Sequence, residues 1–222
     1  MKKIKMILIM LLGMLISIAS LNAAQLNKEQ IARLHFDGGG DWYNNPDMIP
    51  NMVQVLNREL HTDFASEEAV VTPGESRLFD FPFVIMTGHG NISFSENDAR
   101  NLRSWLLRGG TLYADDDYGM DESFRREIAK VFPEKEMVEL PAEHEIFHCF
   151  YELNGTPKIH KHDDKRPQTF AIYDESGRIM VLYTYETNIS DGWSNAHDDP
   201  PNIRQKAFQM GTNILYYIFT KG

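Results

Sequence analysis

The sequence FPFVIMTGHG, which runs from Phe81 to Gly90, determines the architecture that we predict for the rest of the chain. Residues 81–86 are apolar without a break, as is typical of a central strand covered on both faces of its sheet. The apolar run stops at Thr87-Gly88-His89-Gly90, where two glycines flank a histidine. We therefore predict a buried strand that ends in a polar turn.

Amphipathic helices are predicted on both sides of this strand. Before it, apolar residues recur at helical spacing from Met48 to Leu60, with Asn45 as N-cap and Pro46 as the first helical residue. After it, Ser95-Glu96-Asn97-Asp98 has the pattern of a capping box, and the helix it opens reaches Leu107.

Further strands are predicted at Gln30–Phe36, Ala69–Val71 and Thr111–Ala114, and a helix from Glu122 to Val131 follows the last of them. Strands that alternate with helices predict an α/β protein, with a mostly parallel sheet and helices on both faces.

The C-terminal third has a different pattern. Segments Gln168–Tyr173 and Arg178–Tyr185 flank a turn-forming sequence and predict a β-hairpin. Pro200-Pro201 then introduces a final helix that reaches Ile218. We assign this part to the same domain, as antiparallel edge strands and a covering helix.

The N-terminus predicts export. Lys2, Lys3 and Lys5 precede an apolar run from Met6 to Ile18, and small residues follow up to Ala24. This layout is typical of a signal peptide over residues 1–24, which leaves one domain over residues 25–222 in the periplasm or at the cell surface. The apolar run is short for a membrane span, so no integral span is expected after cleavage. The alternative is an uncleaved anchor.

Net charge and cysteine content exclude some partners and an internal disulfide. Loss of the three signal-peptide lysines changes the formal net charge from −10 to −13, which disfavours nucleic acid and anionic lipid as partners and favours cations. Cys149 is the single cysteine, so no internal disulfide is expected.

Polar residues gather where three predicted strands end: at 37–42, 87–90 and 115–118. The carboxyl ends of parallel strands meet at one edge of a sheet, where ligands bind in open α/β folds. The sequence therefore predicts one site at this edge.

Each of these groups also has a plain structural interpretation. The glycines Gly38–Gly40 either make a tight turn or line a ligand. His89 is a candidate metal ligand or general base. Asp115, Asp116 and Asp117 either belong to a solvated loop that caps a helix or bind a cation through oxygen.

The segment from His144 to His148 matches the HExxH zinc pattern, which has meaning only on a helix. Pro141 and the lack of a long amphipathic helix argue against it. Cys149 is interpreted as an idle thiol, and the stretches 162–164 and 197–199 as solvated loops.

The motifs together resemble one known family. Asp41-Trp42 after the glycine turn, Thr87–Gly90, Leu106-x-x-Gly109-Gly110 with Asp115-Asp116, and His144-x-Ile146-Phe147 are similar to domain of unknown function 4159. The resemblance implies the flavodoxin-like fold of class I glutamine amidotransferases, a three-layer αβα sandwich. Some relatives look like domains of membrane-anchored envelope proteins, which implies an envelope protein as a partner.

The chain departs from amidotransferases at the decisive position. Where their cysteine nucleophile sits, after a central strand, this chain has Asp115-Asp116, so glutaminase activity is not expected.

We therefore expect a site for a small polar ligand or a divalent cation, and if the protein is an enzyme, metal-assisted hydrolysis is the reaction that fits best. The alternative is a non-catalytic envelope interaction module. The candidate residues are His89 and Asp116 for catalysis, His89, Asp115 and Asp116 for metal binding, and Asp37, Gly39, Asp41, Trp42, Gly88, Tyr118 and His144 for ligand binding.

Overall fold

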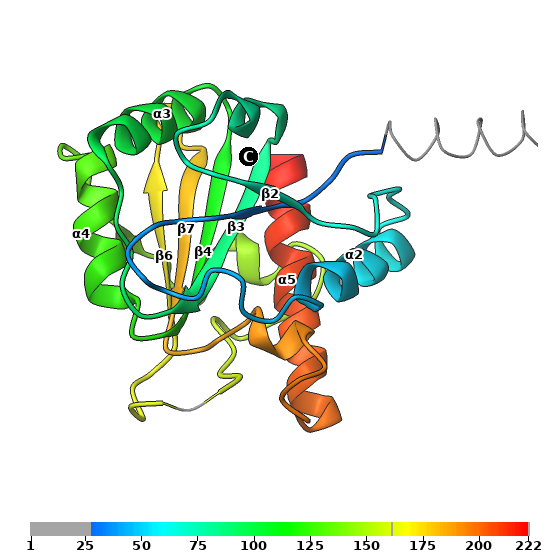
Figure 1. Cartoon of the computed structure of the whole chain (residues 1–222). Coiled ribbons are helices and arrows are strands. Elements are labelled where there is room, and N and C mark those ends of the chain that lie inside the picture. Colours follow the sequence, from blue (N-terminus) through cyan, green and yellow to red (C-terminus); the bar gives the residue numbers. More distant parts are fainter. Residues whose placement is uncertain (1–27, 161, 222) are drawn as a thin grey trace, which may run out of the picture.

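The computed structural model describes residues 28–160 and 162–221, so the predicted signal peptide lies outside the described residues. Its centre is a seven-stranded sheet in the order β2-β1-β3-β4-β7-β6-β5 (Figure 1). The first five strands in this order are parallel; β6 runs antiparallel to β7, and β5 runs antiparallel to β6. The strands are β1 (Ala32–Leu34), β2 (Ala69–Val71), β3 (Phe83–His89), β4 (Thr111–Tyr118), β5 (Val138–Glu139), β6 (Gln168–Tyr173) and β7 (Ile179–Tyr185).

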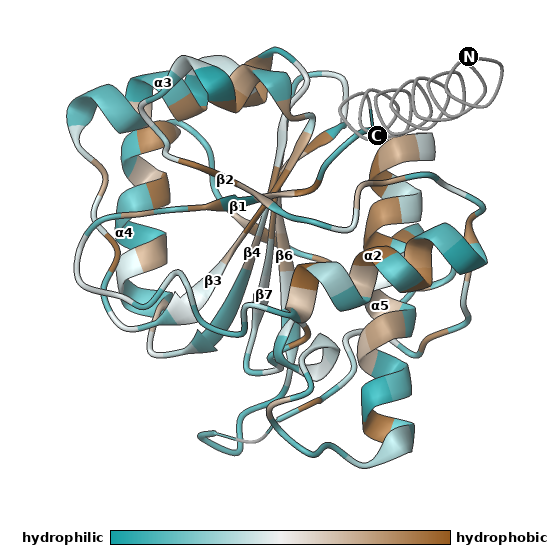
Figure 2. Ribbon diagram, turned by 45° about the vertical axis from the view of Figure 1, so that its right-hand side comes forward, coloured by the Kyte–Doolittle hydropathy of each residue, from teal (hydrophilic) through white to brown (hydrophobic). Residues whose placement is uncertain are grey.

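Helices cover both faces of the sheet (Figures 1 and 2). Helices α3 (Glu96–Leu107) and α4 (Asp121–Val131) pack on one face, and α2 (Met48–Glu59) and α5 (Pro201–Lys221) pack on the other. Each face buries its own apolar cluster, and the apolar sides of the helices turn toward the strands (Figure 2). Three short 3-10 helices lie in loops: η1 (Ser76–Asp80), η2 (Glu145–Phe147) and η3 (Asp191–Trp193). This confirms the predicted α/β class and the mostly parallel sheet.

The observed starts of α3 and α2 can be compared with the predicted ones, and side-chain hydrogen bonds account for both. The capping box at Ser95 is present, since its hydroxyl accepts from the Asp98 amide and the Asp98 carboxylate accepts from the Ser95 amide. The prediction of Asn45 as N-cap was wrong. Helix α2 begins at Met48, and Asn45 instead adopts a left-handed conformation with φ of 50°. Asparagine tolerates this conformation, and its side chain is used elsewhere.

Two strands are longer than predicted and one is shorter. The residues expected to form turns after β3 and β4 belong to the strands themselves, because Asp115 pairs with Thr87 and Asp116 with Gly88. Strand β1 covers only 32–34 of the predicted 30–36.

The C-terminal hairpin is present, but β7 is not an edge strand. It pairs in parallel with β4, while β6 and β5 continue the sheet outward. The end of β7 therefore lies next to the end of β4, which brings the loop after β7 to the predicted site.

Among the described residues, no helix combines the length and the apolar character that a membrane crossing requires.

Candidate functional site

Polar side chains from five chain segments meet at the carboxyl edge of the parallel strands. They come from the loop after β1, the ends of β3 and β4, and the loops on either side of the β6–β7 hairpin. The order of connections reverses between β1 and β3, which is where open α/β sheets form a crevice for ligands. The fold therefore places these side chains at the position that favours a binding site.

A buried arginine fixes the loop after β1. Arg33 lies on β1 with a side chain that is 1% exposed, and its guanidinium donates to both carboxylate oxygens of Glu68. The same group donates to the carbonyl oxygens of Trp42, at 3.2 Å, and of Asn45, at 3.1 Å, as well as to that of Asn44. A planar fork with five donors suits this task. Arg33 therefore holds the backbone of residues 42–45 at the edge of the sheet.

The same loop orients His89 at the end of β3. The Asp41 carboxylate accepts a hydrogen bond from the His89 backbone amide, and its Oδ2 lies 3.0 Å from Nδ1 of the ring. Gly88 has φ of 142°, and a Cβ there would lie 3.0 Å from the Asp41 carbonyl oxygen, so this close approach requires glycine. Within the described part of the chain, Nε2 of His89 has no hydrogen-bond partner, and the side chain is 47% exposed.

Strand alternation separates the three aspartates of β4. Asp115 is fully buried, and its carboxylate accepts from the Ser190 amide at 2.6 Å, from the Ser190 hydroxyl at 2.7 Å and from the Thr184 hydroxyl. Burial raises the pKa of Asp115. These bonds tie β4 to the loop that follows β7. Asp115 thus positions that loop and does not face a ligand.

Asp117 points to the same side of β4 as Asp115 but lies at the edge. Its carboxylate accepts from Asn188 at 2.8 Å and from Asn44, and it lies 3.4 Å from His89 Nδ1. It therefore connects the His89 side of the site with the loop after β7.

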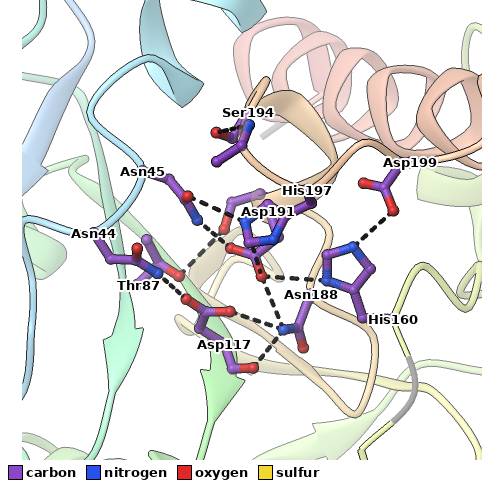
Figure 3. Close-up of polar contacts among 12 residues, drawn as sticks. Asn44, Asn45, Thr87, Asp117, His160, Asn188, Asp191, Ser194, His197 and Asp199 are labelled. Carbon is purple, nitrogen blue, oxygen red and sulfur yellow. Dashed lines mark hydrogen bonds and ion pairs between the residues drawn. The ribbon is translucent and has the colours of Figure 1, made fainter.

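Asp191 lies between two histidines at the centre of this loop (Figure 3). Its Oδ2 is 3.3 Å from His160 Nδ1 and 3.7 Å from His197 Nε2. Both carboxylate oxygens also accept amide hydrogens, one from Asn45 and the other from Asn188 at 3.2 Å. On the far side of His160, Nε2 lies 2.9 Å from an oxygen of Asp199 (Figure 3).

Carboxyl groups dominate this edge of the sheet, and burial and neighbouring groups shift their pKa values. Burial and the adjacent Asp191 carboxylate raise the pKa of Asp117 to about 10. Burial also opposes the ionisation of Asp191, but hydrogen bonds from His160, Asp117 and Asn188 outweigh it and lower its pKa to about 2. The two carboxyl groups therefore hold one proton between them at neutral pH. The hydrogen bond to Asp191 raises the pKa of His160.

Positive side chains do not neutralise these carboxylates. Among the described residues, no lysine or arginine forms a hydrogen bond or ion pair with Asp41, Asp117, Asp191 or Asp199. Histidine and amide groups are their partners. A site of this composition attracts cations.

One group within the described ranges has the spacing of a metal site: His160, Asp191 and His197, whose potential ligand atoms all lie within 4.8 Å of one another. Imidazole nitrogen and carboxylate oxygen are ligands that zinc and related ions prefer in proteins.

A family comparison covers all these residues. The family model described as Domain of unknown function (DUF4159) matches residues 30–219. The chain belongs to this family. A search of curated proteins finds no match to the sequence.

The predicted metal ligands of this DUF4159 domain do not come together as one set. His89 meets Asp41 and Asp117, whereas Asp115 is enclosed by Thr184 and Ser190. Asp116 points to the opposite face, where it accepts from the Met120 amide at 2.9 Å and thus stabilises the start of α4. Successive residues of a strand point to opposite faces, so three adjacent aspartates cannot share one ion.

The other residues predicted to bind a ligand do not lie together in one place. Trp42 stacks on His35 with ring centroids 4.1 Å apart. Tyr118 is half-exposed beside His89, and its hydroxyl donates to Asp163. Asp37 is exposed and forms a backbone bridge with Ser93.

The glycine turn packs against the loop after β3. The Gly40 amide donates to the Asn91 carbonyl at 3.0 Å, and a Cβ at Gly38 would lie 2.7 Å from the backbone of Ile92. Gly39 has open space around it and φ of 92°. These contacts support the tight-turn interpretation.

His144 lies at the amino ends of the parallel strands, opposite to this site. Its Nε2 is 3.4 Å from the Tyr173 hydroxyl, and Tyr173 pairs with Ile179 at the start of β7. The HExxH pattern has no zinc geometry, because the segment forms only the 3-10 helix η2. His148 is instead held by Glu152 and the Ala142 carbonyl.

The sequence interpretation missed the central residues of the site. His160, Asn188 and Asp191 were not singled out, and His197 and Asp199 were assigned to a solvated loop. His197 approaches Asp191, and Asp199 is buried against His160. The available signal was a histidine on each side of an Asn- and Asp-containing loop, but no fixed spacing connects them.

The raised pKa of the buried Asp116 carboxyl group predicts how folding stability changes with pH. Burial raises its pKa from 3.8 to about 7, aided by nearby carboxylates. Below pH 3.8 the group is protonated in both the folded and the unfolded chain; as the pH rises to about 7, only the unfolded chain ionises freely, so folding stability is lost.

Asp116→Asn keeps an acceptor for the Met120 amide and does not ionise. Relative to the wild type, the variant should gain about 2 kcal/mol in unfolding free energy between pH 5 and pH 7. Urea denaturation at both pH values measures this gain, with Asp63→Asn at an exposed position as the control. Wild-type and Asp116→Asn stabilities that change in parallel would contradict the prediction.

Proposed function

We propose that this DUF4159 protein binds a divalent transition-metal ion of the zinc type, with His160, Asp191 and His197 as ligands. The clustering of their three ligand atoms within 4.8 Å carries the proposal. The ion would lie at the carboxyl edge of the sheet, beside Asp117 and His89.

The distances within the cluster support this assignment. Zinc bonds of about 2.0–2.1 Å in a tetrahedral arrangement separate neighbouring ligand atoms by roughly 3.3 Å. Asp191 Oδ2 lies 3.3 Å and 3.7 Å from the two histidine nitrogens. Three protein ligands leave one position open, as in catalytic zinc sites.

The surroundings of His160 also favour a metal ligand. If Nδ1 binds the ion, Nε2 donates its hydrogen to Asp199, and such a carboxylate beside a ligating histidine orients the ring and raises its basicity. The second oxygen of Asp199 and the Asn188 amide oxygen are the buried side-chain atoms without a hydrogen-bond partner among the described residues. Both belong to residues that contact the cluster, where an ion with its bound water would supply partners.

Two finer inferences accompany the metal site. The five parallel strands follow the order β2-β1-β3-β4-β7, which is the 2-1-3-4-5 order of flavodoxin-like folds and supports the amidotransferase-like assignment. Export to the periplasm or cell surface rests on the N-terminal sequence alone.

Metal analysis tests the proposal directly. The purified protein, incubated with zinc and dialysed, should retain one ion per chain, as measured by mass spectrometry of the metal. His160→Ala and His197→Ala should each reduce this to background. His162→Ala, which removes an exposed histidine of the neighbouring segment, should retain the ion. A wild-type protein without zinc, or a His160→Ala variant that retains it, would refute the proposal.

Asp199→Ala tests a residue that orients the proposed metal ligand His160 and does not itself bind the ion. Loss of the carboxylate behind His160 should lower zinc affinity by about 10–100-fold, since the ring is no longer oriented. Competition with a chromogenic chelator measures this affinity. The neighbouring exposed Asp198→Ala should bind zinc like the wild type, and equal affinities for both variants would exclude the supporting role.

A further inference from the structure

We propose that the site is catalytic and hydrolyses an uncharged ester or amide, with His89 as the residue that transfers the proton. This inference rests on the metal site proposed above and names its reaction and substrate class.

His89 has the arrangement of a general acid or base. One ring nitrogen, Nδ1, is held by the Asp41 carboxylate at 3.0 Å, and the backbone amide of His89 is bound to the same carboxylate. The other nitrogen, Nε2, has no partner among the described residues, and the side chain is 47% exposed. A carboxylate that fixes one nitrogen and leaves the other facing solvent orients an imidazole for proton transfer.

The two halves of the site are close together. Asp117 lies 3.4 Å from His89 Nδ1 on one side. On the other side, Asn188 Nδ2 lies 2.8 Å from Asp117 and 3.2 Å from Asp191, one of the proposed metal ligands. One carboxylate and one amide therefore separate the histidine from the ion. We place the substrate between the open metal position and the His89 ring.

The charge of the site selects the substrate. Asp41, Asp117, Asp191 and Asp199 form no hydrogen bond or ion pair with lysine or arginine in the described part of the chain. Phosphate and carboxylate substrates are usually recognised by such cations, and here they would meet carboxylates instead. The flanking side chains Tyr43 and Tyr118, 65% and 48% exposed, offer aromatic faces. An uncharged acyl compound fits these surroundings.

The reaction balances without a further reactant. An ion held by His160, Asp191 and His197 would polarise the carbonyl group. The oxygen of a water molecule bonds to the carbonyl carbon while His89 Nε2 accepts a proton from that water. The bond from this carbon to the ester oxygen or amide nitrogen then breaks, and His89 returns the proton to the leaving group. The products are a carboxylic acid and an alcohol or amine.

The test uses zinc-loaded protein with two probes, uncharged p-nitrophenyl acetate and anionic p-nitrophenyl phosphate. The zinc content is measured in the same samples. The wild type should hydrolyse the acetate at least about 100-fold faster than His89→Gln, which removes proton transfer, and should not hydrolyse the phosphate. His89→Gln should retain zinc, and the exposed His61→Gln should match the wild type in both respects.

The outcomes separate the two proposals. A protein that does not bind zinc fails the metal assignment. A protein that binds zinc but hydrolyses neither probe, prefers the phosphate, or is unaffected by His89→Gln overturns this inference and leaves the metal site standing. A thermal melt that superimposes on the wild type shows that His89→Gln is folded.

Discussion

Replacing Arg33 by methionine is expected to lower the free energy of unfolding by about 3–5 kcal/mol, because it removes one partner of a buried ion pair. The side chain of Arg33 is 1% exposed and donates to Glu68 and to three backbone carbonyl groups of residues 42–45. Methionine fills similar space but supplies no donor. The carboxylate and the three carbonyl groups would lose their partner.

Urea denaturation measures this loss. Arg100→Met serves as the control, because the ion pair of Arg100 with Glu96 is solvent-exposed and worth at most about 0.5 kcal/mol. The loop held by Arg33 carries Asn44 and Asn45, which bind Asp117 and Asp191, so zinc affinity should fall as well. Similar stabilities for the Arg33 and Arg100 variants would show that the hydrogen bonds of Arg33 contribute little to the free energy of unfolding.

Asp115→Ala is expected to cost about 3 kcal/mol or more in unfolding free energy. The substitution leaves the Ser190 amide, the Ser190 hydroxyl and the Thr184 hydroxyl without their common acceptor, inside a fully buried region. The two hydroxyls keep Thr87 and Tyr113 as partners, but each lost hydrogen bond to a charged group costs about 1.5–3 kcal/mol. Relief of the buried charge offsets part of the sum.

The same substitution should weaken zinc binding, since Ser190 immediately precedes the proposed metal ligand Asp191. Thermal denaturation and chelator competition on one preparation measure both effects. Asp63→Ala, at a position that is 78% exposed, is the matched control. An Asp115→Ala protein as stable as this control would contradict the role assigned to Asp115.

The sequence predicted the α/β class and most of the strands and helices because its strongest signals are local. The apolar run of β3 and the capping box of α3 depend on neighbouring residues, and both appear as expected. The start of α2 was wrong for a non-local reason. Asn45 has the character of an N-cap, but its side chain binds Asp191, which lies far away in the sequence.

The position of the site was easier to predict than its residues. Asp41 and His89 follow strands whose parallel arrangement could be inferred, and the structure brings them together. The loop after β7 could not be placed, because β7 was expected at the edge of the sheet and lies beside β4. With β7 misplaced, nothing in the sequence indicated that His160 and His197 approach Asp191.

A different error explains the metal ligands predicted on β4. Three consecutive aspartates suggested a loop with converging oxygens, but the segment is a paired strand. Its side chains alternate, so Asp115 ties the loop, Asp116 supports α4, and Asp117 alone faces His89.

The most direct test of the metal site is anomalous diffraction from crystals grown with zinc, recorded on both sides of the zinc absorption edge. We predict a single strong peak per chain at about 2.0–2.2 Å from His160 Nδ1, His197 Nε2 and an oxygen of Asp191. A map with no peak between these three side chains, or with its peak elsewhere on the protein, would contradict the account.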